Sequence, residues 1–412
     1  MHSITHSVDV AIIGGGIAGL WTLNRLVNQG YNAVLLESRA LGSDQTMASQ
    51  GMIHGGIKYT LGGALTNASE AIADMPGQWS ACLQGRGDVD LRRARILSDH
   101  FHMWSTASLG SRLGGFFASR AVRGRVDAVP RAQLPSLFQD DRFHGKVYRL
   151  VDMVMDTPSL VRALADNVSG RLFTIDWAEA RLARQDGGAC HLSVGDRQAG
   201  FSLAADAWVL CAGQGNADLL SGLGADWPEM QRRPLKQVMV RHHLPHRFYG
   251  HCLGAETTPR LTISSHPLAD GSQVWYLGGS LAEKGAHQDD DTAIASARRE
   301  LTELMPWLDF SDAQWAALAV DRAEPRQRNF ARPDQAFAGW AKWPASADPL
   351  PVIAAWPTKL TLAPNLAQTV TDCLAERALA PSRQPPPALP LPAPGIAPTP
   401  WETAFGVAHA AA

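Results

Sequence analysis

Residues 9–20 read Asp-Val-Ala-Ile-Ile-Gly-Gly-Gly-Ile-Ala-Gly-Leu. The apolar run over 8–13 is rich in β-branched residues, which predicts a short strand buried on both faces. The run over 17–29 has the apolar spacing of an amphipathic helix, and a glycine follows its last residue. A second apolar run, over 33–36, predicts another strand and leads into Glu37. The order of strand, glycine-rich turn, helix and strand predicts a β-α-β unit.

Three glycines of this unit have the spacing Gly-x-Gly-x-x-Gly, namely Gly14, Gly16 and Gly19. Gly14 permits the tight turn, Gly16 lets the backbone approach a pyrophosphate, and Gly19 lets the helix pack closely on the sheet. The helix N-terminus adds free N–H groups and a positive dipole end for the phosphates. Glu37 stands where a carboxylate accepts hydrogen bonds from an adenosine ribose, and its charge disfavours a 2′-phosphate. These features predict a dinucleotide site, with a purely structural turn as the alternative.

The bulk composition excludes some classes of protein. The chain has 412 residues, enough for two interleaved domains or one large α/β unit, and 45% of them are hydrophobic. The 37 basic and 39 acidic side chains nearly balance, so neither a nucleic-acid partner nor an anionic membrane surface is indicated. The five cysteines contain no Cys-x-x-Cys pair, which predicts buried thiols and no metal site. Without a signal segment or a run of ~18 apolar residues, we expect a cytoplasmic protein with no transmembrane segment.

A long stretch of small and polar residues follows the β-α-β unit, over 42–63, and it carries His54, Lys58 and Tyr59. Residues 52–61 read Met-Ile-His-Gly-Gly-Ile-Lys-Tyr-Thr-Leu. This segment resembles the Leu-His-Gly-Gly-Leu-Arg-Tyr-Leu segment of glycerol-3-phosphate dehydrogenases, which belong with D-amino-acid oxidase to one superfamily of FAD-dependent oxidoreductases. L-2-hydroxyglutarate dehydrogenases carry a related segment. Lys58 stands where the closest members have arginine and lacks its bidentate fork, so the match does not support phosphate as the substrate's anion.

The resemblance implies an α/β fold, in which a Rossmann-type FAD-binding domain is interleaved with an α+β substrate domain built on an antiparallel sheet. We expect the FAD-binding domain to comprise residues 1–95, 143–220 and 320–380. The substrate domain would then comprise 96–142 and 221–319, followed by a proline-rich arm over 381–412. The prolines of this arm predict an extended or disordered segment. Trp401 and Phe405 beyond them are candidates for anchoring the end of the chain on the body of the protein or on a partner subunit, with a dangling tail as the alternative.

Further elements are expected from local patterns. Helices are predicted over 99–117, 157–167, 289–304 and 364–378. Short strands over 172–175, 190–194 and 201–203 suggest a small antiparallel meander, and strands over 235–242, 260–264 and 273–278 suggest the substrate sheet.

For the cofactor, the resemblance implies FAD. The glycine motif and the loop after it supply most of the expected contacts, from Gly14, Gly16, Ile17, Ala18, Gly19, Glu37, Ser38, Thr46, Ala48, Ser49, Gln50 and Gly51. An apolar strand ending at Ala212 and Gly213 is similar to the family's second contact. The turn before the last helix, with Lys359, Leu360 and Thr361, would face the flavin edge where negative charge collects on reduction. No second glycine motif is present, so a reductase that also binds NAD(P)H is not expected.

The chemistry implied by a flavin needs a base for the substrate's proton and a cation for its anionic group. His54 is the preferred acid–base residue, because imidazole titrates near neutral pH, although a histidine near this place bonds covalently to the flavin in some relatives. Lys58 and Tyr59 would line the same pocket. The stretch 320–327 resembles the family's Arg-Pro region and leaves Arg322 and Arg326 both open as the anion-binding residue. Weaker candidates, each more often structural, are His251, Arg260, His266 and Tyr276.

These features predict an FAD-dependent dehydrogenase or oxidase. The substrate would be a small anionic hydroxy compound, either like glycerol 3-phosphate or a 2-hydroxy acid. An amino-acid or secondary-amine oxidase is the first alternative, and a flavin-bound assembly or sensing protein is the second. The sequence leaves open the electron acceptor, which could be oxygen, a quinone or another protein, and the oligomeric state.

Overall fold

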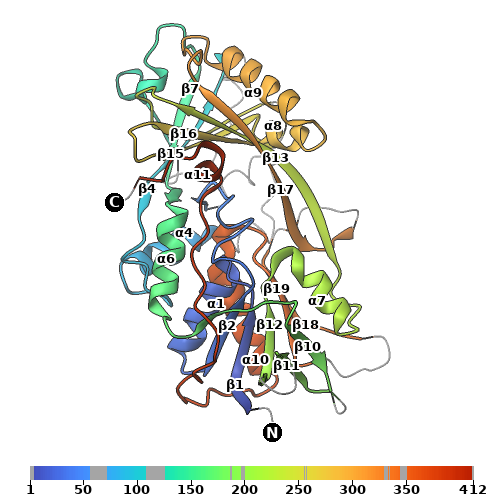
Figure 1. Ribbon diagram of the computed structural model, residues 1–412. Coiled ribbons are helices and arrows are strands. Elements are labelled where there is room, and N and C mark those ends of the chain that lie inside the picture. Colours follow the sequence, from blue (N-terminus) through green and yellow to red (C-terminus); the bar gives the residue numbers. More distant parts are fainter. Residues whose placement is uncertain are drawn as a thin grey trace.

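The structure is a computed structural model that describes residues 4–55, 72–107, 126–185, 188–195, 200–254, 256, 258–328, 333, 335–343 and 350–410. Two large sheets organise the molecule (Figure 1). The first lies with helices α1 (Ile17–Asn28) and α10 (Ala363–Glu376) in the lower half of the view, near the N-terminus. The second lies in the upper half with helices α8 (Ser280–Gly285) and α9 (Asp290–Leu304). The predicted class, an α/β unit combined with a second, largely antiparallel sheet, is confirmed.

The first sheet has the strand order β10-β11-β12-β1-β2-β9, with β19 beside β12 and β18 beside β19. The central strands are parallel, and Ile13 at the end of β1 lies opposite both Leu36 and Leu210. All five residues of β2 are buried, as expected for a parallel strand covered on both faces. The strands of this sheet are β1 (Ile4–Ile13), β2 (Ala33–Glu37), β9 (Leu172–Thr174), β10 (Ala180–Arg184), β11 (Cys190–Val194), β12 (Phe201–Leu210), β18 (Phe337–Trp340) and β19 (Val352–Trp356).

Helices α1, α10 and α6 (Thr157–Asn167) share one hydrophobic core with the first sheet. Helix α6 begins where the sequence predicts it, because the Asp156 carboxylate accepts a hydrogen bond from the backbone N–H of Ser159. The remaining helical segments of the described residues are α4 (Met75–Leu83), α7 (Asn216–Gly222), α11 (Pro400–Phe405) and four 3₁₀ turns, η3 (Arg131–Gln133), η4 (Ser136–Phe138), η5 (Gly213–Gly215) and η7 (Leu360–Leu362). No helix in the described part of the chain is long and apolar enough to cross a membrane.

The second sheet has the strand order β17-β13-β16-β15-β14-β5-β7-β6 and is antiparallel except where β14 meets β5. Strands β13 and β17 form a long ribbon, paired from Met230 with Pro325 to Arg241 with Gln314. The strands are β5 (Phe101–Ser105), β6 (Val126–Ala128), β7 (Lys146–Leu150), β13 (Met230–His242), β14 (Tyr249–Cys252), β15 (Leu261–Pro267), β16 (Gln273–Gly278) and β17 (Gln314–Pro325). A third, small sheet is formed by β3 (Met52–Ile53), β8 (Met153–Met155) and β4 (Ile96–Ser98).

Two of the predicted elements are wrong. The helix expected over 99–117 begins instead with strand β5, whose five residues are all buried between β7 and β14, and residues 108–117 lie outside the described part. The strand at 172 does not join the antiparallel meander, because β9 pairs in parallel with β2. The meander consists of β10, β11 and β12. Strand β10 was not predicted, because its sequence, Ala-Arg-Leu-Ala-Arg, has no β-branched residue.

The proline-rich arm is extended and ordered. Its backbone hydrogen-bonds along the first sheet, with Leu41 N–H donating to the Gly395 carbonyl at 2.8 Å and Thr174 N–H donating to the Pro392 carbonyl at 2.7 Å. Figure 1 shows the arm running from α10 past the first sheet to α11, beside β15 of the second sheet. Trp401 is fully buried there, so the predicted anchor is confirmed. The arm therefore joins the two sheets, while the predicted limits of the interleaved domains stay predictions.

Candidate cofactor and substrate site

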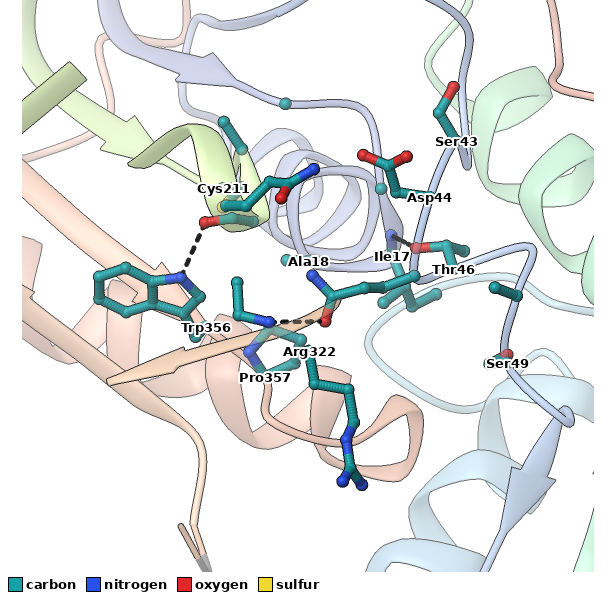
Figure 2. Close-up of a pocket in the computed structure, with 18 of the residues that line it drawn as sticks. Ile17, Ala18, Ser43, Asp44, Thr46, Ser49, Cys211, Arg322, Trp356 and Pro357 are labelled. Carbon is teal, nitrogen blue, oxygen red and sulfur yellow. Dashed lines mark hydrogen bonds between the residues drawn. The ribbon is translucent and has the colours of Figure 1, made fainter. Parts of the chain in front are cut away.

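A cavity of about 920 Å³ lies where the carboxyl ends of β1, β2 and β12 face the β13–β17 ribbon. Ligands of open α/β sheets bind at this end of the strands. Every residue expected to contact FAD lines this cavity except Gly19. Figure 2 shows part of the lining, with the turn at Ile17 and Ala18 facing Trp356 and Arg322 across the space.

The glycine turn is shaped as a cradle. Gly14 has φ +110°, and a Cβ on it would lie 2.5 Å from the Cys211 carbonyl oxygen. A Cβ on Gly19 would lie 2.0 Å from the Gly14 carbonyl oxygen, so this glycine allows helix α1 to pack on the turn. A Cβ on Gly16 would meet only the Thr46 hydroxyl, at 3.1 Å, since that side of the turn opens to the cavity. The backbone can therefore come close to a bound phosphate at Gly16.

The N-terminus of α1 points into the cavity behind this cradle. The Ile17 N–H donates to the Thr46 hydroxyl at 3.0 Å, a contact drawn in Figure 2. Thr46 belongs to the loop that also brings Ser43, Ala48 and Ser49 to the cavity wall. The free N–H groups of the helix and the loop hydroxyls form a donor set suited to a diphosphate.

Glu37 lines the cavity beside the glycine turn. Its side chain is buried and accepts hydrogen bonds from two backbone N–H groups, that of Gly15 at 2.5 Å and that of Arg39 at 2.9 Å. A carboxylate offers about four acceptor positions, so Glu37 keeps capacity for ribose hydroxyls. Ser38 lines the wall beside it.

The end of β12 supplies the opposite wall at Ala212 and Gly213. Gly213 has φ +58°, and its carbonyl accepts a hydrogen bond from the Trp356 indole at 3.0 Å (Figure 2). Asn216 holds this turn from behind, because its side chain accepts from the Ala212 N–H at 2.8 Å and donates to the Leu210 carbonyl at 3.0 Å. Sequence reasoning missed Asn216, although a buried asparagine directly after a glycine turn is a signal for such a role.

The far end of the cavity joins the loop at 50–54 to the turn before α10. The Thr361 hydroxyl donates to the Met52 carbonyl at 3.2 Å and accepts from the His54 N–H at 3.3 Å. His54 and Lys359 are both buried to more than 90% and line the cavity. Thr361 therefore connects the two loops, and His54, Lys359 and Gln50 are among the residues that line the cavity here.

The β13–β17 ribbon forms the wall of the cavity opposite the glycine turn. It contributes two arginines and several apolar or neutral side chains, namely Arg232, Leu235, Gln237, Val320, Arg322 and Ala323. Arg322 lies 3.9 Å from the Glu283 carboxylate of α8. Arg326 follows the end of β17, lies outside the cavity and forms an ion pair with Glu229. The structure thus brings Arg322, and not Arg326, to the space that His54 lines.

Six further residues were candidates from the sequence. Lys58 and Tyr59 are outside the described residues. The four weaker candidates are not among the residues that line the cavity. Each has a contact elsewhere: His251 with Thr262, Arg260 with Glu300, His266 with Ser264, and Tyr276 with Gln237. All five cysteines are buried and free. Burial raises the pKa of Cys211, the one that borders the cavity, to about 12, so it stays a neutral thiol. No group of side chains suited to a metal ion occurs within the described ranges.

The residues present fit a flavin dinucleotide. Gly16 leaves open space for a phosphate, α1 offers its N-terminus, and Glu37 offers a carboxylate to a ribose. From this end the cavity continues to His54 and the ribbon, where a small substrate has room.

Comparison with known proteins agrees with this geometry. A family model described as FAD dependent oxidoreductase (DAO) matches residues 9–338. A probable FAD-dependent oxidoreductase of Pseudomonas aeruginosa is 48% identical over 402 residues, covering 97% of this chain and 98% of that protein. The crystal structure of an FAD dependent oxidoreductase from Pseudomonas aeruginosa has a TM-score of 0.82 at 42% identity, covering 98% of this chain and 100% of that one. Glycine oxidase from Geobacillus kaustophilus, at 17% identity, covers 90% of this chain and 95% of that one with a TM-score of 0.64, a likeness in fold.

Proposed function

The chain belongs to the DAO family of FAD-dependent oxidoreductases, and from this premise we propose that it oxidises a small anionic hydroxy compound at the His54 end of the cavity. The single observation that carries the proposal is that His54 and Arg322 line the same space as the dinucleotide cradle. A bound flavin accepts a hydride at N5 from a carbon that bears a hydroxyl or an amine.

Arg322 binds the anionic group of the substrate and sets its orientation. A guanidinium holds an oxyanion in a fixed pose through paired N–H donors, whether the anion is a carboxylate or a phosphate. The Glu283 carboxylate lies 3.9 Å from the Arg322 guanidinium. The reacting carbon is thereby placed toward the loop that carries His54.

His54 accepts the hydroxyl proton as the hydride leaves. The Thr361 hydroxyl holds the backbone of His54 in place through the hydrogen bond at 3.3 Å. An imidazole ring nitrogen can accept a proton and later release it, which suits this exchange. The β13–β17 ribbon forms the wall of the cavity on the side of Arg322.

Anaerobic mixing of the purified holoenzyme with candidate reductants tests the proposal. The panel comprises glycerol 3-phosphate, several 2-hydroxy acids and several amino acids, and the measured quantity is loss of the oxidised flavin absorbance. Bleaching by a hydroxy compound is the expected result. Bleaching by amino acids alone would instead indicate an amino-acid oxidase. If no compound of the panel bleaches the flavin, an oxidase or dehydrogenase of this substrate class is contradicted.

A further inference from the structure

The ribbon wall carries polar groups at two separated places. Leu235 is paired with Val320, and Gln237 is paired with Leu318. Opposite residues and residues two apart share one face of a ribbon, so Arg322, Val320, Leu235 and Gln237 follow one another along the face that lines the cavity. Arg322 and Leu318 are four residues apart, which is about 13 Å of strand. The wall therefore has a guanidinium at one end, apolar side chains in the middle and an amide at the other end.

The amide of Gln237 has a defined orientation. Its Oε1 accepts a hydrogen bond from the Tyr276 hydroxyl at 2.7 Å, while the Ala48 carbonyl lies 3.1 Å from that hydroxyl. The hydroxyl carries one hydrogen, and the shorter distance assigns it to Gln237. Gln237 lines the cavity, and its Nε2 group has no hydrogen-bond partner among the described residues. Gln237 thus offers N–H donors to whatever occupies this end of the site.

Tyr276 is itself held firmly. It is fully buried, its backbone carbonyl accepts from the Gln50 amide at 2.8 Å, and its ring lies 5.8 Å from that of Trp401 on the C-terminal arm. Burial raises the pKa of Tyr276, so its hydroxyl stays a donor at physiological pH. The cofactor loop and the arm together therefore hold the Tyr276 hydroxyl that orients the amide of Gln237.

We propose that Gln237 is a specificity-determining residue that donates a hydrogen bond to an oxygen of the substrate remote from the anion bound by Arg322. The inference deepens the proposed function and rests on the anion site of Arg322. The substrate class is a small anion with an apolar segment and then a second acceptor, such as a carbonyl or carboxylate oxygen. Tyr276 acts through Gln237 and is a positioning residue.

Binding of unreactive acids to the holoenzyme tests this inference, with the shift of the visible flavin spectrum as the signal. The probes are pentanoate and 4-oxopentanoate, and hexanoate and 5-oxohexanoate, because each pair differs only in one ketone acceptor. In at least one of the two pairs, we expect the oxo acid to bind about fivefold more tightly than the acid without the ketone, because one hydrogen bond contributes about 1 kcal/mol. Gln237→Leu and Gln237→Glu should each reduce this ratio to about one, and Tyr276→Phe should reduce it partly.

The matched control is Gln273→Leu, a change of another buried glutamine of the same sheet, whose amide donates to the Leu244 carbonyl outside the cavity. It should retain the ratio of the wild-type enzyme. The inference is overturned if neither oxo acid is preferred by the wild-type enzyme, or if the preference survives in both Gln237 variants at unchanged flavin content. Arg322→Leu should weaken both members of a pair equally. If none of the four acids binds, the anion site of Arg322 is contradicted. If the acids bind but the two members of each pair bind equally, only the role of Gln237 is contradicted.

Discussion

The Nε2 atom of His409, in the C-terminal arm, lies 2.5 Å from the Oδ1 atom of Asp156, the residue that caps helix α6. Asp156 is fully buried, and its other oxygen accepts from Arg95 at 2.9 Å. Burial opposes the ionised form of Asp156, but the hydrogen bond from His409, together with Ser159 and Arg95, outweighs it and lowers the pKa to about 2. This contact connects the end of the chain to the N-terminus of helix α6.

Stability should therefore fall at acid pH through Asp156. Because its folded pKa is depressed, its stabilisation is present above the unfolded value of about 3.9 and is lost as pH falls toward about 2. We expect a loss of about 2 to 3 kcal/mol in the free energy of unfolding across this window. Denaturant unfolding at pH 5, 4, 3 and 2 measures it, and Asp156→Asn should flatten the profile. An equal slope in the variant would contradict this assignment.

The buried Trp401 should stabilise the whole molecule. It is fully buried and stacks on His266 with ring centroids 3.9 Å apart. Trp401→Ala should lower the free energy of unfolding by about 3 to 5 kcal/mol, because it removes a large core side chain and leaves a cavity. Thermal unfolding of the holoenzyme measures the effect, with Trp227→Ala as the control, since Trp227 is 39% exposed. Equal shifts in the two variants would show that the arm contributes little.

The glycine turn should not tolerate a methyl group where the helix packs on it. A Cβ on Gly19 would lie 2.0 Å from the Gly14 carbonyl oxygen, far inside contact distance. We expect Gly19→Ala to be purified without the yellow colour of bound flavin. Gly77→Ala is the control, because nothing lies within 4 Å of a Cβ there. A Gly19→Ala protein with full flavin absorbance would refute the role given to this turn.

Arg322 and Arg326 should differ in their effects on turnover. Arg322→Leu removes a charge from the cavity wall, and we expect kcat/KM for the substrate to fall about 10- to 100-fold, since hydrogen bonds to charged groups contribute about 1.5–3 kcal/mol. Arg326→Leu changes a residue paired with Glu229 outside the cavity and should leave kcat/KM within about twofold. Steady-state kinetics of the two variants measures kcat/KM. If Arg326→Leu lowers kcat/KM more than Arg322→Leu does, Arg322 does not bind the substrate.

His54 should govern the rate of flavin reduction. Loss of a general base costs about 10²- to 10⁴-fold, and His54→Ala should slow anaerobic flavin reduction to that extent. Stopped-flow absorbance of the flavin under anaerobic conditions gives the rate directly. If that rate is unchanged, His54 has no part in the reaction. Flavin that stays with acid-precipitated wild-type protein would favour the competing role, a covalent link at His54.

The local sequence was sufficient to predict the first strands and helix of the chain and several later helices. β1, α1 and β2 follow from apolar periodicity and from the spacing of the glycines between β1 and α1. Helix α6 begins at Thr157, as its N-terminal signals predict, and helix α9 begins at Asp290, one residue after the expected start. The residues 101–105 misled the same reasoning, because a strand buried on both faces shows no alternation and can be mistaken for a helix.

Local spacing was enough to predict the dinucleotide turn, the family resemblance and most of the residues that line the cofactor end of the cavity, because these depend on short-range patterns and on the backbone freedom of glycine. The fold as a whole decides which arginine lies in the cavity, since β17 ends at Pro325 and leaves Arg326 beyond the ribbon. It alone revealed Gln237, whose orientation depends on Tyr276 from a neighbouring strand, and the course of the arm, whose contacts at Leu41 and Thr174 lie more than two hundred residues earlier in the chain. Such contacts are set by strand register and by packing between distant segments, which no local pattern specifies.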